Sequence, residues 1–370
     1  MKRQSLYLAM AAALLLCLGA ADGDGEDGKG PDVYVAGIEV DVQNKNSTAV
    51  LWKNGEPQYL SRESHIAIAA SVYVSGDDVF VAGTESNGKN STAVLWKNGE
   101  AQQLVDAAKA NSVFAVGRDV YVAGGQRNAK KKYIATVWKD GEAQPLTDGK
   151  RDAGASSVYV SSGDVYAAGY AKNAKKKDVA MLWKNGEEQP LTNGERDASA
   201  SCVFVSGGDV CVTGFETNEL EARVAMLWVN GQGKRLSFQN YKGCDADAMS
   251  VFVSGGDVYV VGYQDRFEAT GTGNIFVKRR APVLWKNGDI NRLPNGKMGA
   301  PAIAAGSVFV SGGDVYIARQ DLCPIESKLA AGKIGAEAFT LSAFIQKNGV
   351  SQRLGGSEEK MSMPLSVFVK

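Results

Sequence analysis

The sequence predicts an all-β protein, a seven-bladed β-propeller of four-stranded antiparallel blades whose ring is closed by the C-terminal strand in the first blade. The first observation is a phrase, SVFVSGGDVYVVG at Ser250–Gly262, that returns along the chain. The second is another phrase, close to AVLWKNGE, that lies between these copies. Repeats with a period of a few tens of residues are typical of solenoids, propellers and arrays. Related copies of the first phrase begin at Ser71, Ser112, Ser157, Cys202 and Ser307.

Each repeat unit contains four short strand candidates, as the fourth unit illustrates. The first strand, Ser157–Val160, and the second, Asp164–Gly169, are joined by a Ser-Ser-Gly-Asp turn, and Gly suits such a tight hairpin because it readily adopts positive φ. The third strand, Val179–Lys184, runs into an Asn-Gly dipeptide, which is a strong hairpin signal. The fourth strand, Glu187–Thr192, is more polar. Two hairpins joined by longer loops make a four-stranded antiparallel meander.

The polarity of the strands indicates how the sheets pack. The first three strands of each unit are almost continuous apolar runs, such as VFV, VYVAG and AVLW, and a sheet that is covered on both faces needs this pattern. The fourth strand carries Glu and Gln, so we expect it at an outer edge. Sheets stacked radially around an axis cover one another on both faces, as the blades of a β-propeller do.

An aspartate at the start of the second strand counts the blades. The first-strand phrase precedes only the last six of these seven aspartates, and its seventh copy is the final stretch Ser366–Val369. We therefore expect Ser366–Val369 to pair with Val33–Gly37, which closes the ring and removes sheet edges that invite aggregation. The seven aspartates are Asp32, Asp78, Asp119, Asp164, Asp209, Asp257 and Asp314.

The run of an apolar strand, a GGD turn, VYVAG, a loop and LWKNG resembles the kelch repeat, and the resemblance covers residues 32–370 at the level of architecture. The resemblance implies a propeller that is closed by a C-terminal innermost strand. Most units depart from the kelch pattern because a single Gly follows the second strand, and only Gly124-Gly125 keeps the pair. WD40 repeats fit less well, since the sequence has no Trp-Asp dipeptide.

The N-terminus is typical of an export signal. Two basic residues precede the apolar run Leu6–Leu18, which is too short to span a membrane comfortably, and small residues allow cleavage after Ala21. We expect a secreted, periplasmic or cell-surface protein without a transmembrane helix after cleavage. A lipid anchor at Cys17 is the alternative. The predicted divisions are a signal peptide at residues 1–21, a flexible acidic leader at residues 22–31 and the propeller at residues 32–370.

Charge limits the partners of the protein. The 41 basic and 41 acidic residues give a formal net charge of zero, which argues against a nucleic-acid surface. Three basic clusters, Lys130–Lys132, Lys175–Lys177 and Lys278–Arg280, lie in equivalent loops. We interpret them as solvated loop residues, with a binding face for an anionic partner as the alternative. The predicted state is a monomer without a cofactor.

The sequence offers no catalytic constellation and no metal site. The only histidine, His65, lies in a loop, and a single His excludes a His-rich metal site. The repeat supplies no base–orienter pair around His65, so a Ser-His-Asp triad is not expected either. The cysteines show no CxxC or Cys/His spacing. Cys202 and Cys211 lie in two strands of one hairpin, where Cys202 should face Thr213. The two thiols are then diagonal neighbours, which is a poor geometry for a disulfide, so free buried thiols are expected.

Repeated aromatic and acidic residues give two further predictions. Six tryptophans occupy one repeat position, and we interpret them as packing between blades, with sugar-stacking platforms as the alternative. The candidate ligand site is formed by Asp152, Asp197 and Asp245, each five residues before a first-strand phrase, and by Arg151 and Arg196. Because the connections between blades run inward, we expect these carboxylates to rim the central opening. Loop capping by Asp side chains is the alternative.

Two enlarged loops complete the functional prediction. Tyr263–Ala281 and Arg319–Ser342 lie on the face that carries these aspartates, and insertions in a repeat protein often mark its binding face. The predicted function is an exported, non-catalytic binding propeller that recognises a protein or a glycan through its loop-rich face. Kelch-like exported propellers include sialic-acid mutarotases. The resemblance therefore implies an alternative, a small-molecule sugar mutarotase that uses the central opening and in which the Asp and Arg loop residues act.

Overall fold

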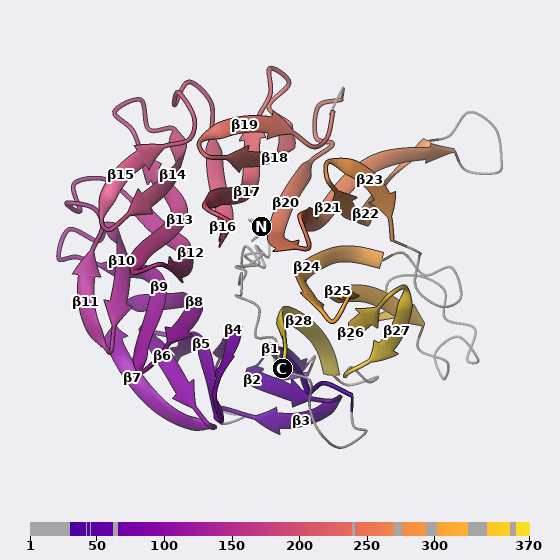
Figure 1. The fold of residues 1–370 in the computed structure, drawn as a ribbon, viewed down its shortest axis with the longest axis horizontal. Helices are drawn as coiled ribbons and strands as arrows, with labels where there is room; N and C mark the ends of the chain where they lie inside the picture. The colour runs from indigo at the N-terminus through magenta and orange to yellow at the C-terminus, as the bar shows by residue number, and fades with distance from the viewer. Residues whose placement is uncertain are drawn as a thin grey trace, which may run out of the picture.

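The structure is a computed structural model that contains 28 strands and no helix in its described part. The strands form seven groups of four that follow one another around a central axis (Figure 1). Each group is an antiparallel sheet, so the predicted fold class, an all-β seven-bladed propeller, is confirmed. The described residues are 30–41, 43–44, 46–61, 66–238, 241–269, 276–293, 302–324, 339–355 and 360–370.

The blades are numbered in chain order and their strands are given from the axis outward. Blade 1 contains β28 (Lys360–Val369), β1 (Val33–Asp41), β2 (Ser47–Lys53) and β3 (Glu56–Tyr59). Blade 2 contains β4 (Ile66–Ser75), β5 (Asp78–Ser86), β6 (Ser91–Lys97) and β7 (Glu100–Asp106). Blade 3 contains β8 (Ala108–Val116), β9 (Asp119–Arg127), β10 (Tyr133–Lys139) and β11 (Glu142–Pro145). Blade 4 contains β12 (Ala153–Ser161), β13 (Asp164–Lys172), β14 (Asp178–Lys184) and β15 (Glu187–Pro190). Blade 5 contains β16 (Ala198–Ser206), β17 (Asp209–Thr217), β18 (Arg223–Val229) and β19 (Gln232–Arg235). Blade 6 contains β20 (Ala246–Ser254), β21 (Asp257–Ala269), β22 (Phe276–Lys286) and β23 (Asp289–Arg292). Blade 7 contains β24 (Ala302–Ser311), β25 (Asp314–Pro324), β26 (Phe339–Lys347) and β27 (Val350–Arg353).

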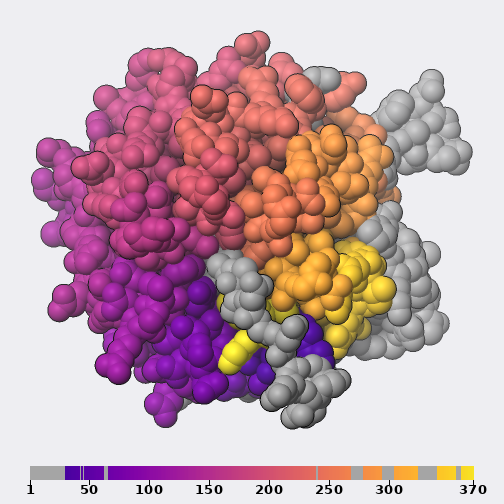
Figure 2. Space-filling model, viewed as in Figure 1, coloured from indigo at the N-terminus to yellow at the C-terminus, as the bar shows by residue number. Residues whose placement is uncertain are grey.

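The C-terminal strand β28 closes the ring. It pairs antiparallel with β1, with Val33 opposite Val369, as the repeat predicts. The backbones of Asp32 and Lys370 extend this ladder by two hydrogen bonds of 2.8 and 2.9 Å. The first and last parts of the chain therefore lie side by side (Figure 2). A single parallel bridge between β2 and β4 joins blade 1 to blade 2, whereas the other five blades are separate sheets.

Each inner strand carries a β-bulge, and this bulge explains the glycine at the end of the second-strand phrase. A Cβ added to Gly83 would lie 1.9 Å from the carbonyl oxygen of Ile68 in the inner strand. The equivalent glycines of blades 1 and 3–6 would meet an inner-strand carbonyl at 1.9 to 2.1 Å. Only a residue without a side chain fits, because the two backbones approach closely. The bulge residues are Ala70, Asn111, Ser156, Ser201, Met249, Gly306 and Leu365.

The three inner strands of a blade are buried and the outermost strand is exposed. Five of the seven residues of β14 are buried, whereas all four residues of β15 are exposed. The six tryptophans are at most 1% exposed, which confirms that they form the core between blades and are not sugar-stacking platforms. Such large aromatic side chains contribute much of the apolar area that a core buries. They are Trp52, Trp96, Trp138, Trp183, Trp228 and Trp285.

Blade 7 departs from the repeat in its core. Arg319 takes the place of the bulge-facing glycine and Gln346 that of the tryptophan, and both are buried. Arg319 Nη2 is 2.7 Å from Asp321 Oδ2, and Arg319 Nη1 donates a hydrogen bond of 3.2 Å to Gln346 Oε1. Gln is smaller than Trp and so leaves room for the guanidinium group. A second register shift in β24, between Ala302 and Ala304, accommodates the side chain that replaces glycine.

The DVY and WKNG phrases are joined on the face that carries the tight turns, here called the hairpin face. In blade 4, Asp164 Oδ2 is 2.8 Å from Lys184 Nζ, and the ammonium group lies 5.4 Å from the centre of the Tyr166 ring. The same Asp–Lys pair recurs in blades 1, 2, 3, 6 and 7. In blade 5, Val229 replaces the lysine and Cys211 the tyrosine. The repeated aspartates that count the blades are therefore structural.

Around the axis, neighbouring inner strands are linked by aromatic rings and by hydrogen bonds. One ring from each inner strand contacts the next, with centroids 4.8 to 5.3 Å apart, and the contact of Tyr73 with Phe368 closes the circuit. Six serine hydroxyls accept a hydrogen bond from the next blade, as Ser366 Oγ does from Val72 N at 3.3 Å. Cys202 takes the serine position in blade 5. The seven rings belong to Tyr73, Phe114, Tyr159, Phe204, Phe252, Phe309 and Phe368.

Some predicted features lie outside the described residues. They are the signal peptide, most of the leader, the possible lipid-anchor site Cys17 and the histidine His65. The proposed cleavage and export therefore stay predictions. Among the residues that the structure describes, no helix is long and apolar enough to cross a membrane.

Candidate functional site

The loop face is the face opposite the hairpin face. It contains the loop between the second and third strands of each blade and the connection from each blade to the next. In blades 3, 4 and 5 the loop between the second and third strands has the same conformation. An asparagine side chain accepts hydrogen bonds from backbone N–H groups two to four residues later, and the fourth loop residue has a φ of 59 to 63°. Such Asn capping shapes a turn without requiring particular side chains at the other positions. The asparagines are Asn128, Asn173 and Asn218, and the fourth residues are Lys131, Lys176 and Glu221.

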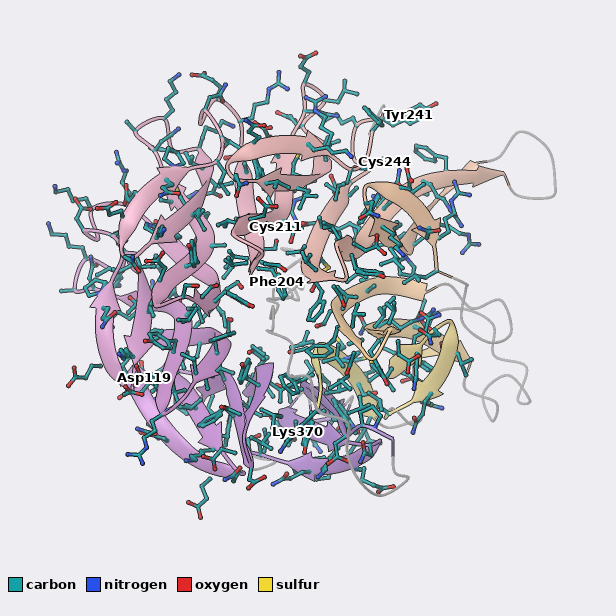
Figure 3. All side chains as sticks on the ribbon, in the orientation of Figure 1. Asp119, Phe204, Cys211, Tyr241, Cys244 and Lys370 are labelled. Carbon is teal, nitrogen blue, oxygen red and sulfur yellow. The ribbon has the colours of Figure 1, made fainter. Side chains whose placement is uncertain are left out.

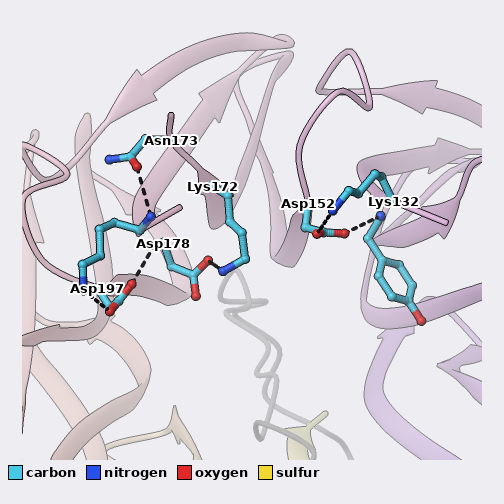
Figure 4. Close-up of polar contacts among 8 residues, drawn as sticks. Lys132, Asp152, Lys172, Asn173, Asp178 and Asp197 are labelled. Atoms are coloured by element: carbon cyan, nitrogen blue, oxygen red, sulfur yellow. Dashed lines mark hydrogen bonds and ion pairs between the residues drawn. The ribbon is translucent and has the colours of Figure 1, made fainter. Parts of the chain in front are cut away.

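Two of the predicted aspartates hold this loop against the next blade (Figure 4). Asp152 Oδ1 accepts a hydrogen bond of 3.0 Å from Tyr133 N, and Asp152 Oδ2 is 3.0 Å from Lys132 Nζ. Asp197 binds the equivalent N–H group at 3.0 Å and Lys177 Nζ at 2.9 Å. Burial opposes ionisation of Asp152, yet the Tyr133 and Lys132 contacts hold its pKa below the usual value. Both carboxylates face the third strand of the preceding blade, not the central opening that the sequence predicts for them.

The third aspartate, Asp245, keeps the backbone contact but lacks the lysine. Its Oδ1 accepts a hydrogen bond of 2.9 Å from Arg223 N. Ala222 stands in the loop where the two preceding blades have lysine. The connection between blades 5 and 6 therefore differs from the two before it.

The two predicted arginines take no part in these aspartate contacts. Arg151 is exposed and has no ion-pair partner among the described residues. Arg196 Nη2 lies 3.1 Å from Glu219 Oε1 in the loop of blade 5. The structure therefore distributes the five predicted site residues over three separate junctions and does not bring them together in one site.

A charged cluster makes the junction between blades 5 and 6 unlike the others. Asp247, near the start of β20, is only 8% exposed, and its Oδ1 has no hydrogen-bond partner within the described part of the chain. Its Oδ2 lies 3.6 Å from Arg223 Nη1. Burial raises the pKa of Asp247 to about 7, against the opposing influence of the Arg223 and Arg280 guanidinium groups. This carboxyl group can therefore exchange a proton near neutral pH.

Arg280 and Asp265 form the other half of the cluster. They are cross-strand partners in β21 and β22, and Arg280 Nε donates a hydrogen bond of 2.7 Å to Asp265 Oδ1. Burial opposes ionisation of Asp265, but Arg280 and Lys278 hold its pKa below the usual value. The Arg280 guanidinium also lies 3.8 Å from the centre of the Tyr263 ring. Fixed charges of both signs thus lie beside a carboxyl group that titrates.

Blade 6 carries an arm that extends outward from the ring (Figure 1). β21 has 13 residues and β22 has 11, compared with nine and seven for their counterparts in blade 4. The antiparallel ladder continues as far as Ala269 opposite Phe276. The insertion predicted as a loop at Tyr263–Ala281 is thus mainly a continuation of the two strands. The insertion at Arg319–Ser342 likewise lengthens β25 and β26.

Exposed aromatic side chains lie at the base of this arm. The rings of Tyr241 and Phe267 meet edge to face with centroids 5.4 Å apart, and these residues are 63% and 44% exposed. Phe238, in the same connection between blades, is 75% exposed. Tyr241 lies at the outer rim beside the arm, whereas Phe204 lies at the inner end of its blade (Figure 3). Grouped exposed aromatic rings mark interaction sites more often than isolated ones do.

Uncharged residues occupy the bulges of the seven inner strands. No three His, Cys, Asp or Glu side chains of the described part are grouped to share a metal ion. Cys211 lies opposite Phe204 and Cys202 opposite Thr213, as the hairpin register predicts. Cys211 and Cys244 are buried free thiols, whereas Cys202 is disulfide-bonded, so the expectation of a free thiol is confirmed for Cys211 and wrong for Cys202.

Sequence reasoning missed Asp247 and Arg223, and it interpreted Lys278–Arg280 as solvated loop residues, whereas they lie in β22 and Arg280 pairs with Asp265. The signal that could have found them is departure from the repeat, since Asp247 stands where the two preceding blades have Gly154 and Ser199. Asp247 is itself buried, and a buried charged residue needs partners from neighbouring segments. Comparing repeat positions one by one would therefore have pointed to this junction.

Comparisons with known proteins agree with the fold. No family model matches the sequence, and no curated protein matches it. A puromycin-hydrolyzing peptidase of Mycobacterium tuberculosis is 11% identical with a TM-score of 0.53, over 88% of this chain and 53% of that one. The β-propeller domain of the Trilobed protease from Pyrococcus furiosus is 11% identical with a TM-score of 0.49, over 89% and 97%. An acylaminoacyl peptidase in complex with Z-Gly-Gly-Phe-chloromethyl ketone is 12% identical with a TM-score of 0.48, over 89% and 52%.

These similarities concern the fold alone. The chain spans about half the length of the acylaminoacyl peptidase and of the mycobacterial peptidase. Proteins this distant share an architecture without sharing a site, because function depends on particular side chains placed on a common fold. The structural neighbours are β-propeller proteins, as this chain is.

Proposed function

We propose that this protein is an exported, non-catalytic binding propeller that recognises a protein or a glycan through its loop face, with blade 6 at the centre of the recognition surface. The observation that carries the proposal is that blade 6 departs from the repeat on one face. On the hairpin face it keeps the repeated pair, with Lys286 Nζ 2.6 Å from Asp257 Oδ2. On the loop face it has the arm, the Tyr241–Phe267 pair and the buried Asp247.

The chemistry of this surface supports recognition. Aromatic side chains dominate the binding energy of many interfaces, especially when charged residues surround them. Tyr241 and Phe267 supply the rings, and Arg223 and Lys278, each about half exposed, supply charge beside them. A rigid scaffold that presents variable loops is a common arrangement for binding proteins.

The test is to capture partners on glycan arrays and in pull-downs, and to compare two variants. The first is Y241A/F267A, which removes both rings. The second replaces residues 266–279 by Asn-Gly, a turn that suits the Asp265–Arg280 pair and removes the arm. Both should fold as the wild type does and lose the captured partner by at least tenfold.

The matched control is I290A/V350A, which removes two exposed apolar side chains outside the loop face, 47% and 76% exposed. It should bind as the wild type does. If both test variants fold and still bind as the control does, the recognition surface lies elsewhere and the proposal fails.

We also propose that the protein is exported and that its repeats are related to kelch repeats. The basic residues and the apolar run Leu6–Leu18 support export, and N-terminal sequencing of the protein made in a secreting host tests cleavage after Ala21. The x-Y-V-A-G second strand and the aromatic third strand support a kelch-like ancestry. A lipid on Cys17, found by mass spectrometry, would replace simple secretion with membrane anchoring.

A sugar mutarotase of the sialic-acid type is the second candidate, and one observation favours it. Asp247, with a pKa of about 7 beside Arg223, could transfer a proton while the guanidinium group binds a carboxylate. The test measures anomer exchange of a reducing sugar acid by NMR, with the wild type and with Asp247→Asn. Exchange that the wild type accelerates and the variant does not would favour the enzyme. If anomer exchange is equally fast with and without the protein, the mutarotase function is rejected and only the binding function remains proposed.

A further inference from the structure

The loop face of blades 3 and 4 is strongly basic although the whole chain has no net charge. The two loops inside these blades, the two connections that follow and the adjoining strand ends (Arg127, Lys172 and Asp178) carry eleven basic and five acidic side chains, a net charge of +6. The basic ones are Arg127, Lys130, Lys131, Lys132, Lys150, Arg151, Lys172, Lys175, Lys176, Lys177 and Arg196. The acidic ones are Asp148, Asp152, Asp178, Glu195 and Asp197.

Ion pairs account for only six of these cations. Lys132, Lys150, Lys172, Lys175, Lys177 and Arg196 each have a carboxylate within 3.1 Å. The other five are exposed and have no ion-pair partner among the described residues. They are Arg127, Lys130, Lys131, Arg151 and Lys176. This group of five side chains is called the basic surface below.

The fold does not require lysine in these loops. The loop of blade 5 has the same Asn-capped conformation, but it carries Leu220 and Glu221 where blade 4 has Lys175 and Lys176. Lys176 moreover has a φ of 63°, a conformation that any residue with a Cβ adopts at a cost. Two successive blades thus carry like-charged side chains that neither the backbone nor an ion pair needs.

We infer that the basic surface binds an acidic polysaccharide, a linear polymer of sugars that carry carboxylate or sulfate groups. The inference rests on the proposed binding function and names a partner for a different part of the same loop face. A flexible, solvated array of ammonium groups attracts a repeating anion through long-range charge.

Two other polyanions fit the basic surface less well. A protein partner usually needs buried apolar anchors, and none of the exposed large apolar residues of the described chain lies in these loops. A single-stranded nucleic acid usually stacks its bases on exposed aromatic rings, and the basic surface has none. The Arg127 guanidinium lies 5.3 Å from the ring of Tyr133, which is only partly exposed. Charge without exposed aromatic or apolar anchors favours the polysaccharide.

The experiment measures binding of a fluorescein-labelled polyuronate oligosaccharide by anisotropy at low ionic strength. The test variant is K131E/K176E, because blade 5 already holds Glu221 at that loop position. We expect binding to fall by at least tenfold with no change in melting temperature. Wild-type binding should also fall steeply as salt is raised toward 1 M, where the screening length shrinks to about 3 Å.

The matched control is R118E/K234E, which makes the same change in net charge at exposed residues of blades 3 and 5 outside the loop face. It should bind as the wild type does. Equal weakening by both variants would overturn the inference, as would absence of polyuronate binding, or stronger binding of polyglutamate or single-stranded DNA. The variant without the blade 6 arm should keep polyuronate binding, so failure of this inference and failure of the proposed function are distinguishable.

Discussion

At the scale of single residues, one inner-strand carbonyl oxygen explains why the second-strand phrase of six blades ends with glycine. The bulge in the inner strand turns a backbone carbonyl toward that position, and a Cβ there would lie 1.9 to 2.1 Å from the oxygen. The bulge brings this carbonyl oxygen to the place that a Cβ atom would occupy. Glycine inside a strand usually weakens it, but at this position no larger residue fits. Blade 7 keeps Arg319 at this position only with a second register shift in β24.

Adjacent glycines in β9 test this explanation. A Cβ on Gly124 would lie 1.9 Å from Lys109 O, whereas a Cβ on Gly125 would have its nearest neighbour at 3.5 Å, an ordinary contact. Gly124→Ala should therefore lower the free energy of unfolding by about 1–3 kcal/mol, as overpacking does. Gly125→Ala should leave it unchanged within about 0.5 kcal/mol. Urea unfolding of both variants measures the difference, and equal stability of the two would refute the steric explanation.

Asp247 makes stability depend on pH. Burial raises its pKa to about 7, above the value of an unfolded aspartate, so the folded state keeps a proton that the unfolded state has lost. Stability that this group confers is full below about pH 4 and is lost as the pH rises toward 7. Asn at position 247 stays neutral at every pH. The free energy of unfolding of Asp247→Asn, relative to that of the wild type, should therefore rise by about 2–4 kcal/mol between pH 4 and 8.

Chemical unfolding at several pH values measures this difference. The matched control is Asp77→Asn, a fully exposed turn residue, which should follow the wild-type curve. Parallel curves for Asp247→Asn and the wild type would show that the carboxyl group ionises freely in the folded state.

At the scale of elements, β28 is the strand on which the ring depends. Val367, Phe368 and Val369 are at most 6% exposed and lie between β1 and the neighbouring blades. Deleting residues 365–370 should expose the apolar edge of β1 and lower the melting temperature by well over 10 °C, since several large side chains lose their burial. Lys370→Ala changes only an exposed side chain and should melt as the wild type does. An unchanged melting temperature after the deletion would rule out the closure.

The strand pattern could be predicted from sequence, and the arms could not. The apolar runs and the Asn-Gly turns, with Asp140-Gly141 in blade 3, predicted four strands for each unit, because both signals recur along the chain. The stretch around Gln264–Ala269 has neither the apolar run nor the turn residue of the repeat, so it was interpreted as a loop. Pairing with β22 makes it a strand, and that pairing follows from the register already set nearer the core.

At the scale of the whole molecule, the sequence repeat was enough to predict the architecture but not the position of the candidate site. The count of seven aspartates and the displaced C-terminal strand were sufficient for a closed seven-bladed ring. The predicted aspartates were chosen because they recur, and recurrence proved structural for Asp152 and Asp197, which tie loops to the next blade. The cluster around Asp247 draws on β18, β20 and β22, and no local sequence signal joins segments that far apart.

The pairing of β28 with β1 also fixes when the molecule can be completed during synthesis. The ribosome makes β28 after every other strand of the propeller, so the first blade waits for its innermost strand through the synthesis of all the others. The circuit of aromatic rings cannot close before that moment, because Phe368 is the member that joins blade 7 to Tyr73 of blade 2. Until β28 has been made, β1 presents an unpaired apolar edge, the kind of edge that recruits strands of other chains. The synthesis of β28 therefore removes this edge and completes the ring in one step.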